Sequence, residues 1–466
     1  MSYKNLEERL SAAKSPVDML RNSQAGPNPY PGVKPEYTNW RDEQQAWQST
    51  AVLYNQSYHM AELEVTGPDG RRLLSDLAIN SMANLAPDRA KQFVPVTPYG
   101  HVIGDVILFE REPDVFDLVG RAPVLNWITY HAQTGGYDAQ VELDQRTALR
   151  GDGRRKHYRF QVQGPNAMAI IEKVLGRKPD DLGFFRVETI RIAGRDVHAL
   201  RHGMAGQPGW ELYGPWADYD AVHDAIVEAG EEFGLRLVGG RAYSSNAIES
   251  AWIPSPVPAI YSGDELKAYR EWLPADGYEG TASIGGSFAS ADIEDYYFTP
   301  WDLSYGHIIK YDHDFIGRDA LERLEAQGGH RTKVSLALHD DDVTDAIHSQ
   351  FGPKEARAKF IEFPSAVYSM HPMDAVKVGG ETVGISTWIG YSSNEGKMIT
   401  LAVLDSEHAE PGTEVTFVWG EENGGTAKPT VEPHRQVEIR ATVAPAPYVA
   451  AVQKDYAPGS WRAAHV

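Results

Sequence analysis

Residues 158–165 read Tyr-Arg-Phe-Gln-Val-Gln-Gly-Pro, a strand-like run that stops at a Gly-Pro pair. After this turn the sequence predicts a helix that ends at Gly176, because glycine commonly follows the last residue of a helix. Further along, residues 222–233 carry apolar side chains at helical spacing, and Gly234 is a suitable C-cap. A strand and two helices between about residues 155 and 240 predict one lobe of a larger α+β domain.

The region before this lobe shows the same order of elements. Residues 105–109 and 115–119 predict two paired strands around a polar turn. Pro123 then begins a predicted helix that ends near residues 135–136, in the usual order of proline first and glycine last. We therefore expect two lobes within residues 1–330, built from mixed sheets with helices packed on them.

Short apolar strands follow from residue 331 onward. Gly-Gly, Pro-Gly and Asn-Gly-Gly turns separate them, and they comprise residues 333–338, 375–378, 381–385, 399–404, 415–419 and 437–443. This pattern predicts a small β-barrel or sandwich over residues 331–466, with a boundary near 325–332 after a helix over 318–327. The three aspartates at 340–342 predict a solvated turn, and residues 390–397 predict a turn between strands rather than a phosphate loop.

The composition is that of an acidic globular protein with two or three domains. Of the 466 residues 42% are hydrophobic, and the formal net charge of −21 argues against binding to nucleic acid or anionic membranes. The chain contains no cysteine, so disulfides and thiolate nucleophiles are excluded, and its 16 histidines show no metal-ligand spacing. The N-terminus is unlike a signal peptide and no apolar run approaches the roughly 20 residues of a membrane span, so we expect a cytoplasmic protein.

Five segments, in one order along the chain, resemble the glycine-cleavage T-protein family. They are Gln163-Gly-Pro165, Gly203-Met-Ala-Gly206 with Trp210-Glu-Leu-Tyr213, Phe315-Ile-Gly-Arg-Asp-Ala-Leu321, Gly384-Ile-Ser386 and Pro411-Gly-Thr413. This resemblance implies a T-protein-like, three-domain folate-binding fold of the α+β class with a C-terminal β-barrel. It also implies tetrahydrofolate as the cofactor.

Longer segments are similar to the tetrahydrofolate-dependent vanillate and syringate O-demethylases, which share that fold. The similarity runs from about residue 15 to 460 and includes residues 92–105, 130–136 and 419–425. The T-protein family carries an arginine where this chain has Tyr243, as the O-demethylases do. The resemblance implies that the methyl group of a methoxybenzoate (syringate, vanillate or 3-O-methylgallate) is moved to N5 of tetrahydrofolate, which leaves a catechol-type product.

The resemblance implies a site for this small aromatic acid. Tyr243 is expected to donate a hydrogen bond or a proton to the ether oxygen, and His59 to tune or relay that proton, although a structural histidine explains His59 equally well. Arg121 is the expected partner of the benzoate carboxylate, since a guanidinium binds a carboxylate through two parallel hydrogen bonds. Tyr30 and Tyr58 are expected to line the pocket. For Tyr30 the alternative role is a hydrophobic anchor of the loop. With Tyr58 at its position, a preference for syringate over the other substrates stays open.

A second set of residues is implied for the folate. Glu211 is expected to accept hydrogen bonds from the N–H groups of the pterin ring. Gln163 and Gln56 would add amide contacts, and Trp252 would stack on the cofactor or flank it. Asp105 falls where the T-protein family places a carboxylate near the reacting nitrogens of the folate. The alternative is a structural role in which Asp105 caps a turn. The resemblance implies no metal.

The same fold also supports other functions, which the residues of this chain disfavour. Tyr243 in place of the arginine disfavours an aminomethyltransferase and a sulfonium demethylase. A non-catalytic folate-binding maturation protein is disfavoured because such proteins carry a characteristic cysteine motif, whereas this chain has no cysteine. The sequence leaves open which methoxybenzoate is preferred and how many copies of the chain associate.

Overall fold

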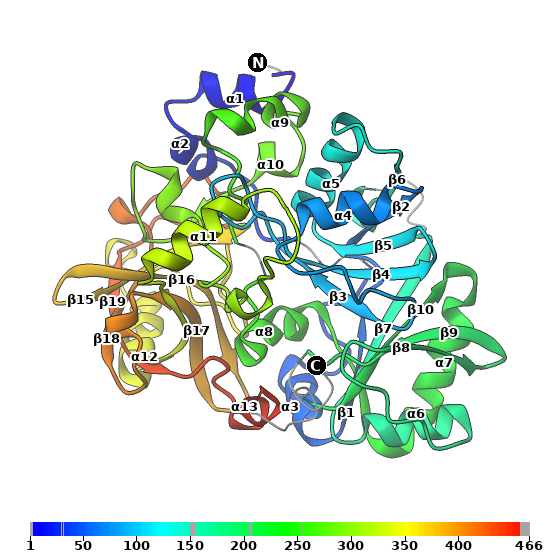
Figure 1. Ribbon diagram of the computed structural model, residues 1–466. Helices are drawn as coiled ribbons and strands as arrows, with labels where there is room; N and C mark the ends of the chain where they lie inside the picture. The colour runs from blue at the N-terminus through cyan, green and yellow to red at the C-terminus, as the bar shows by residue number, and fades with distance from the viewer. Residues whose placement is uncertain are drawn as a thin grey trace.

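The structure is a computed structural model that describes residues 3–28, 30, 32–149, 155–204, 207–254 and 256–456. Figure 1 shows a β-barrel on one side of the molecule and two sheets with their helices on the other. Helix α8 (Gly240–Ser250) lies between these two halves and packs against the barrel strands β16 and β17. The α+β class with a C-terminal barrel, predicted from the sequence, is confirmed.

The first sheet has five antiparallel strands in the order β3-β4-β5-β2-β6. Its strands are β2 (Ala61–Thr66), β3 (Ala90–Phe93), β4 (Val106–Glu112), β5 (Val115–Gly120) and β6 (Gln140–Asp144). Helices α4 (Gly70–Leu77) and α5 (Ala122–Thr134) share a buried core with it. Strands β4 and β5 form the predicted hairpin. Because α5 begins directly after β5, the residue between them, Arg121, becomes the N-cap of that helix.

The second sheet has the order β11-β1-β7-β10-β9-β8. Its strands are β1 (Ala51–Asn55), β7 (His157–Gln163), β8 (Val187–Ile192), β9 (Arg195–Leu200), β10 (Gly209–Pro215) and β11 (Leu235–Leu237). Side chains of a strand alternate between its two faces, so the apolar residues of β7 share one core with α6 (Ala167–Leu175) and α7 (Tyr219–Gly230). Its polar residues, Arg159, Gln161 and Gln163, are therefore buried on the opposite face. Helix α6 ends at Gly176 as predicted.

The closed barrel contains all six predicted strands, in the order β13-β17-β16-β15-β18-β19. They are β13 (Thr332–Leu338), β15 (Asp374–Val378), β16 (Glu381–Ser392), β17 (Lys397–Leu404), β18 (Glu414–Trp419) and β19 (Val437–Ala444). The predicted turn at 390–397 connects β16 to β17. The prediction of a solvated turn at 340–342 was wrong. These aspartates form the first turn of α12 (Asp340–His348), where carboxylates face the positive end of the helix dipole.

The remaining elements lie outside these three sheets, and two of them, β12 and β14, pair with each other. They are α1 (Leu6–Ala12), α2 (Pro16–Arg21), α3 (Trp40–Ser49), α9 (Lys267–Trp272), α10 (Tyr278–Thr281), β12 (Ile284–Gly285), α11 (Arg318–Gln327), β14 (His371–Pro372) and α13 (Ala450–Tyr456). We keep the domain boundary at residues 330–331 and the second lobe at about 155–240 as proposals. The first barrel strand, which starts at Thr332, supports the former. The sheet of the second lobe also takes in β1, from outside those bounds.

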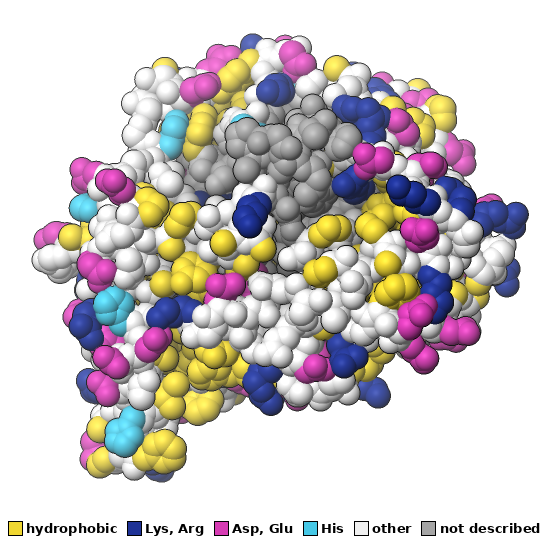
Figure 2. Space-filling model, turned by 90° about the horizontal axis from the view of Figure 1, so that it is seen from below, with side chains coloured by type: hydrophobic (Ala, Val, Ile, Leu, Met, Phe, Trp, Pro, Cys, Tyr) yellow, Lys and Arg dark blue, Asp and Glu magenta, His cyan; other side chains and the backbone are white. Residues whose placement is uncertain are grey.

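Charged side chains of both signs are interspersed over the face of the molecule that Figure 2 shows. The excess of acidic residues that gives the chain its net charge of −21 is thus mixed with Lys and Arg on that face. Within the part of the chain that the structure describes, no helix is long and apolar enough to cross a membrane.

Candidate active site

Three aromatic side chains from distant parts of the chain meet beneath the start of α8. Tyr243 lies in the first turn of this helix, His59 follows β1, and Tyr30 belongs to the loop before α3. Ring centroids are 4.8 Å apart for Tyr30 and Tyr243, 5.0 Å for His59 and Tyr243, and 5.1 Å for Tyr30 and His59. We call these three residues the aromatic cluster. The structure thus brings together both predicted catalytic residues and one predicted substrate residue.

Tyr243 and His59 are both held in their neutral forms. Burial raises the pKa of Tyr243 well above its usual value of 10.0. Burial, together with the nearby positive charge of Arg121, lowers the pKa of His59 to about 3. Nδ1 of His59 is buried without a hydrogen-bond partner among the described residues. At neutral pH, Tyr243 is therefore a hydroxyl donor and His59 an uncharged imidazole.

Amide side chains lie next to the Tyr243 hydroxyl. Nε2 of Gln56 donates to Oε1 of Gln161, at 3.2 Å, and approaches the sulfur of Met204 at 2.9 Å. The backbone N–H of Met204 donates to Oε1 of Gln163 at 2.8 Å, and the Tyr243 oxygen lies 4.0 Å from the Met204 sulfur. Met204 thus links the predicted donor to the predicted folate residues. Met204 stands in one of the segments that resemble the T-protein family, but the sequence assigns it no role, because a methionine side chain has no titratable or strongly polar group.

Glu211 is buried on the same face of the second sheet. Strand β10 pairs with β7 so that Glu211 lies opposite Gln161, and its carboxylate forms an ion pair with Arg159. Both side chains are only 3% exposed. One carboxylate oxygen is therefore already engaged within the protein, and the other lies 3.7 Å from Nδ1 of His202. Sequence analysis missed Arg159, since its contact depends on the register between two strands far apart in the chain.

Two polar atoms of this amide group are buried without a hydrogen-bond partner among the described residues. They are Oε1 of Gln56 and Nε2 of Gln163. One is an acceptor and the other a donor, and a buried polar group without a partner is costly unless a ligand satisfies it. A flat heterocycle with both N–H and carbonyl groups on its edge, such as a pterin, fits this pair. The residues present are therefore suited to hold a folate.

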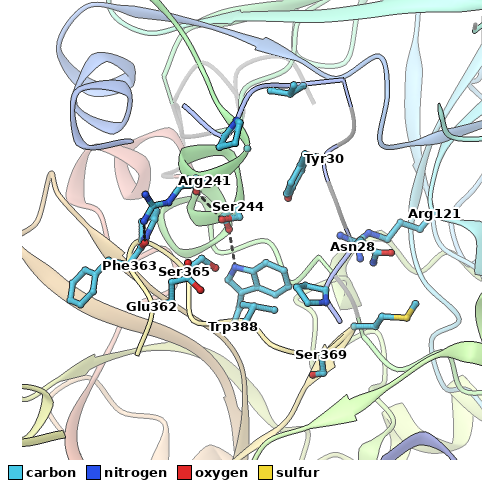
Figure 3. Close-up of a pocket in the computed structure, with 17 residues that line it drawn as sticks. Asn28, Tyr30, Arg121, Arg241, Ser244, Glu362, Phe363, Ser365, Ser369 and Trp388 are labelled. Atoms are coloured by element: carbon cyan, nitrogen blue, oxygen red, sulfur yellow. Dashed lines mark hydrogen bonds between the residues drawn. The ribbon is translucent and has the colours of Figure 1, made fainter. Parts of the chain in front are cut away.

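A cavity of about 350 Å³ opens on the other side of Tyr30. Figure 3 shows Arg121 and Asn28 at one end of it, Tyr30 above Trp388, and Ser365 with Glu362 at the opposite end. Its size suits a substituted benzoate. Tyr30 lines this cavity, whereas Tyr243 and His59 lie behind its ring.

Asp105 and Trp252 form a second group. The indole Nε1 of Trp252 donates to Oδ2 of Asp105 at 3.2 Å, and Gln92 donates to the same oxygen at 2.9 Å. Burial raises the pKa of Asp105, and the hydrogen bonds from Gln92 and Trp252 partly offset this rise. The Trp252 side chain is 40% exposed, which leaves one face of the indole available to a ligand.

Tyr58, a predicted substrate residue, lies outside both the aromatic cluster and the lining of the cavity. Its hydroxyl lies 3.3 Å from that of Tyr219, and its ring meets Trp216 edge to face. The ring also packs under Gly32, where an added Cβ would lie 2.7 Å from it. Tyr58 therefore points away from the cavity, while its neighbour His59 points toward Tyr243.

Similarity to known proteins extends along nearly the whole chain. The profile of the GCVT N-terminal domain matches residues 19–254. The chain is 58% identical to a syringate O-demethylase from a Sphingobium species over 459 residues, which covers 98% of this chain and 99% of the relative. It is 29% identical to a sesamin methylene transferase from a Sinomonas species, over 83% of each chain.

A solved structure has the same fold. The crystal structure of the glycine cleavage system aminomethyltransferase T from Bartonella henselae superposes with a TM-score of 0.59, at 16% identity, over 89% of this chain and 90% of the other. Because the profile covers about half of the chain and the Sphingobium relative is similar along nearly all of it, this chain belongs to the GCVT family.

Proposed function

We propose that this protein is a tetrahydrofolate-dependent O-demethylase that moves the methyl group of a methoxybenzoate to N5 of tetrahydrofolate, giving 5-methyltetrahydrofolate and a catechol-type product. One observation carries the proposal. The aromatic cluster lies between a benzoate-sized cavity with Arg121 at its end and the two unpartnered amide atoms of Gln56 and Gln163. The 58% identity to a syringate O-demethylase supports it independently.

The reaction is a displacement at the methyl carbon, in which the methyl–oxygen bond breaks as a methyl–nitrogen bond forms. Tetrahydrofolate would supply the nucleophilic nitrogen. The chain must then stabilise the phenolate that departs. Because the pKa of Tyr243 lies well above 10.0, its hydroxyl keeps its proton at neutral pH and is available to donate a hydrogen bond to that oxygen. Neutral His59, in contact with the same ring, helps to orient Tyr243.

Alignment of the two flat ligands is the second contribution. A carboxylate held by Arg121 fixes the plane and direction of the aromatic ring. On the other side, Gln56, Gln163 and Glu211 would hold the edge of the pterin, and the exposed face of Trp252 would flank it. Two reactants fixed in this way lose their relative freedom before the reaction, which lowers its entropic barrier.

The other functions predict different products. An aminomethyltransferase would leave methoxybenzoates unchanged, and so would a sulfonium demethylase or a non-catalytic folate-binding protein. The purified protein is therefore incubated with syringate, vanillate and 3-O-methylgallate, with and without tetrahydrofolate. We expect demethylated product and 5-methyltetrahydrofolate in equal amounts, only when tetrahydrofolate is present. No turnover of any of the three substrates would overturn the proposal. We also propose that the protein works in the cytoplasm.

A further inference from the structure

A buried row of charged side chains joins the two sheets behind Glu211. Glu62 comes from β2 of the first sheet, whereas Arg159 and Glu211 come from β7 and β10 of the second (Figure 1). Arg159 forms an ion pair with Glu211, and its Nη2 lies 3.6 Å from Oε1 of Glu62. Nδ1 of His157, also from β7, lies 2.8 Å from the other carboxylate oxygen of Glu62. We call Glu62, Arg159 and Glu211 the charged triad.

The guanidinium of Arg159 is fixed between the two sheets. It lies over the ring of Tyr213 from β10, 4.6 Å from the centroid, and over the ring of Phe109 from β4, 5.2 Å from the centroid. Aromatic faces attract a planar cation that stacks on them, so these two rings restrict how the guanidinium can turn. The nitrogens of Arg159 therefore point to its two carboxylate partners in a defined way.

The charged triad is a costly way to join two sheets. Two carboxylates and one guanidinium leave a formal charge of −1 in a buried place. Burial raises the pKa of Glu62, but the hydrogen bond with His157 and the charge of Arg159 outweigh this and lower the pKa to about 2. Apolar side chains of similar volume often stabilise a protein as well as a buried ion pair does. The excess negative charge is better suited to a ligand that brings hydrogen-bond donors.

Glu62 and Glu211 share the donors of a single guanidinium. Nη1 of Arg159 pairs with one oxygen of Glu211, while Nη2 lies on the side of Glu62. A guanidinium that faces one carboxylate alone binds both of its oxygens through two parallel hydrogen bonds. Because Glu62 draws Nη2 toward itself, Glu211 is kept out of this bidentate form. Its second oxygen thus remains for a ligand.

We propose that Glu62 and Arg159 are positioning residues for the pterin, which hold Glu211 with one oxygen bound and the other left for the pterin N–H groups. The inference rests on the proposed function and deepens it, because it gives the first sheet a part in folate binding. Strand β2, which carries Glu62, pairs with β5, and β5 leads directly to Arg121. The same sheet thereby positions the partner of the substrate carboxylate and, through the charged triad, the pterin.

The test compares tetrahydrofolate with its analogue that lacks the 2-amino group of the pterin, by calorimetry without oxygen. Glu62→Gln keeps the volume of the side chain and an acceptor for His157, but it removes the charge that draws Nη2 of Arg159 away from Glu211. We expect the Kd of tetrahydrofolate to rise about five- to tenfold, the effect of one weakened hydrogen bond. The Kd of the analogue should rise much less, because the analogue lacks a donor on the edge that faces Glu211. The affinity for syringate should stay unchanged.

Two further variants sharpen the comparison. Glu64→Gln is the matched control, because Glu64 lies two residues further along β2, on the same face, but pairs with Arg111. It should leave the affinities for both folates unchanged. Arg159→Lys keeps the positive charge, but an ammonium lacks the planar fork that serves two carboxylates at once. This variant should therefore show the same selective loss of tetrahydrofolate affinity as Glu62→Gln.

The outcomes separate this inference from the proposed function. If the wild-type protein neither binds tetrahydrofolate nor demethylates syringate, the proposed function fails. If the wild type does both, but Glu62→Gln and Arg159→Lys weaken the two folates equally or not at all, the positioning role is wrong while the function stands. Unfolding temperatures recorded for each variant distinguish a general loss of structure, which weakens both folates and syringate alike, from the selective loss that we expect.

Discussion

The rings of His59 and Tyr243 meet edge to face, with their centroids 5.0 Å apart and their planes at 72°. This contact joins a residue that follows the first strand of one sheet to the helix that lies against the barrel. It holds the Tyr243 ring from one side, while Tyr54 packs against it edge to face at 5.2 Å. Packing against both rings thereby fixes the Tyr243 ring, and its hydroxyl lies beside the sulfur of Met204.

The lowered pKa of His59 makes a prediction about stability. The folded protein keeps His59 neutral down to a pH of about 3, whereas the unfolded chain protonates it near 6.5. Between these values the unfolded state binds the extra proton, so this residue makes the protein less stable as the pH falls below 6.5. His59→Gln should therefore lose less stability on acidification from about pH 6.5 to 5, by up to about 1.4 kcal/mol per pH unit.

Urea unfolding at several pH values measures this difference. His307→Gln, a change at an exposed histidine, serves as the control and should follow the wild-type curve. A His59→Gln curve parallel to that of the wild type would show that His59 is not held neutral in the folded state.

Arg121→Ala tests the carboxylate partner. Loss of a charge-assisted pair of about 1.5–3 kcal/mol should raise KM about ten- to a hundredfold for methoxybenzoates that carry a carboxylate. Guaiacol, which lacks the carboxylate, should show little change. Steady-state kinetics on both substrates give the comparison. Equal effects on the two would assign Arg121 a structural role at the start of α5.

The glutamines and Glu211 are expected to differ in how they affect folding. Gln163→Leu should raise KM for tetrahydrofolate and lower stability by only about 1 kcal/mol, because the hydrogen bond from the backbone N–H of Met204 to Oε1 is lost while Nε2 has no partner among the described residues. Glu211→Gln should raise the same KM and lower stability by more, up to roughly 3 kcal/mol, since buried Arg159 then keeps only its longer ion pair with Glu62, at 3.6 Å. Chemical unfolding together with folate titrations separates the two effects. Equal losses of stability in both variants would contradict this division of roles.

Local patterns in the sequence were sufficient for much of the fold. The barrel strands and the hairpin of β4 and β5 are short apolar runs bounded by glycine, proline or aspartate, and each forms at its predicted place. Strand β16, however, runs on to Ser392, beyond its predicted end at residue 385. The sheet that β1 joins could not be predicted from local patterns. Its partners, β7 and β11, lie far downstream, and a strand carries no local mark of the sheet that it joins.

The site residues divide in a similar way. Most of the positions that the family resemblance implied, including Tyr243, His59 and Gln56, lie together in the structure. Tyr58 does not join them, because consecutive residues of a turn point in different directions and the sequence does not show which one faces inward. The ion pair of Arg159 with Glu211 depends on the register between β7 and β10, which becomes visible only in three dimensions.

The most direct test of the account follows the methyl group itself, in wild-type protein and in Tyr243→Phe. Each is mixed with syringate labelled with ¹³C in its methoxy groups and with excess tetrahydrofolate, and the label is followed through a single turnover by NMR. The account predicts that the wild type moves the label to N5 of tetrahydrofolate, in an amount equal to the demethylated product. Tyr243→Phe should bind folate normally but transfer the label about 100-fold more slowly or worse, because positioned donors of this kind typically contribute about 10²–10⁴-fold. Label that appears as formaldehyde, or a variant that keeps more than about a third of the wild-type rate, would contradict it.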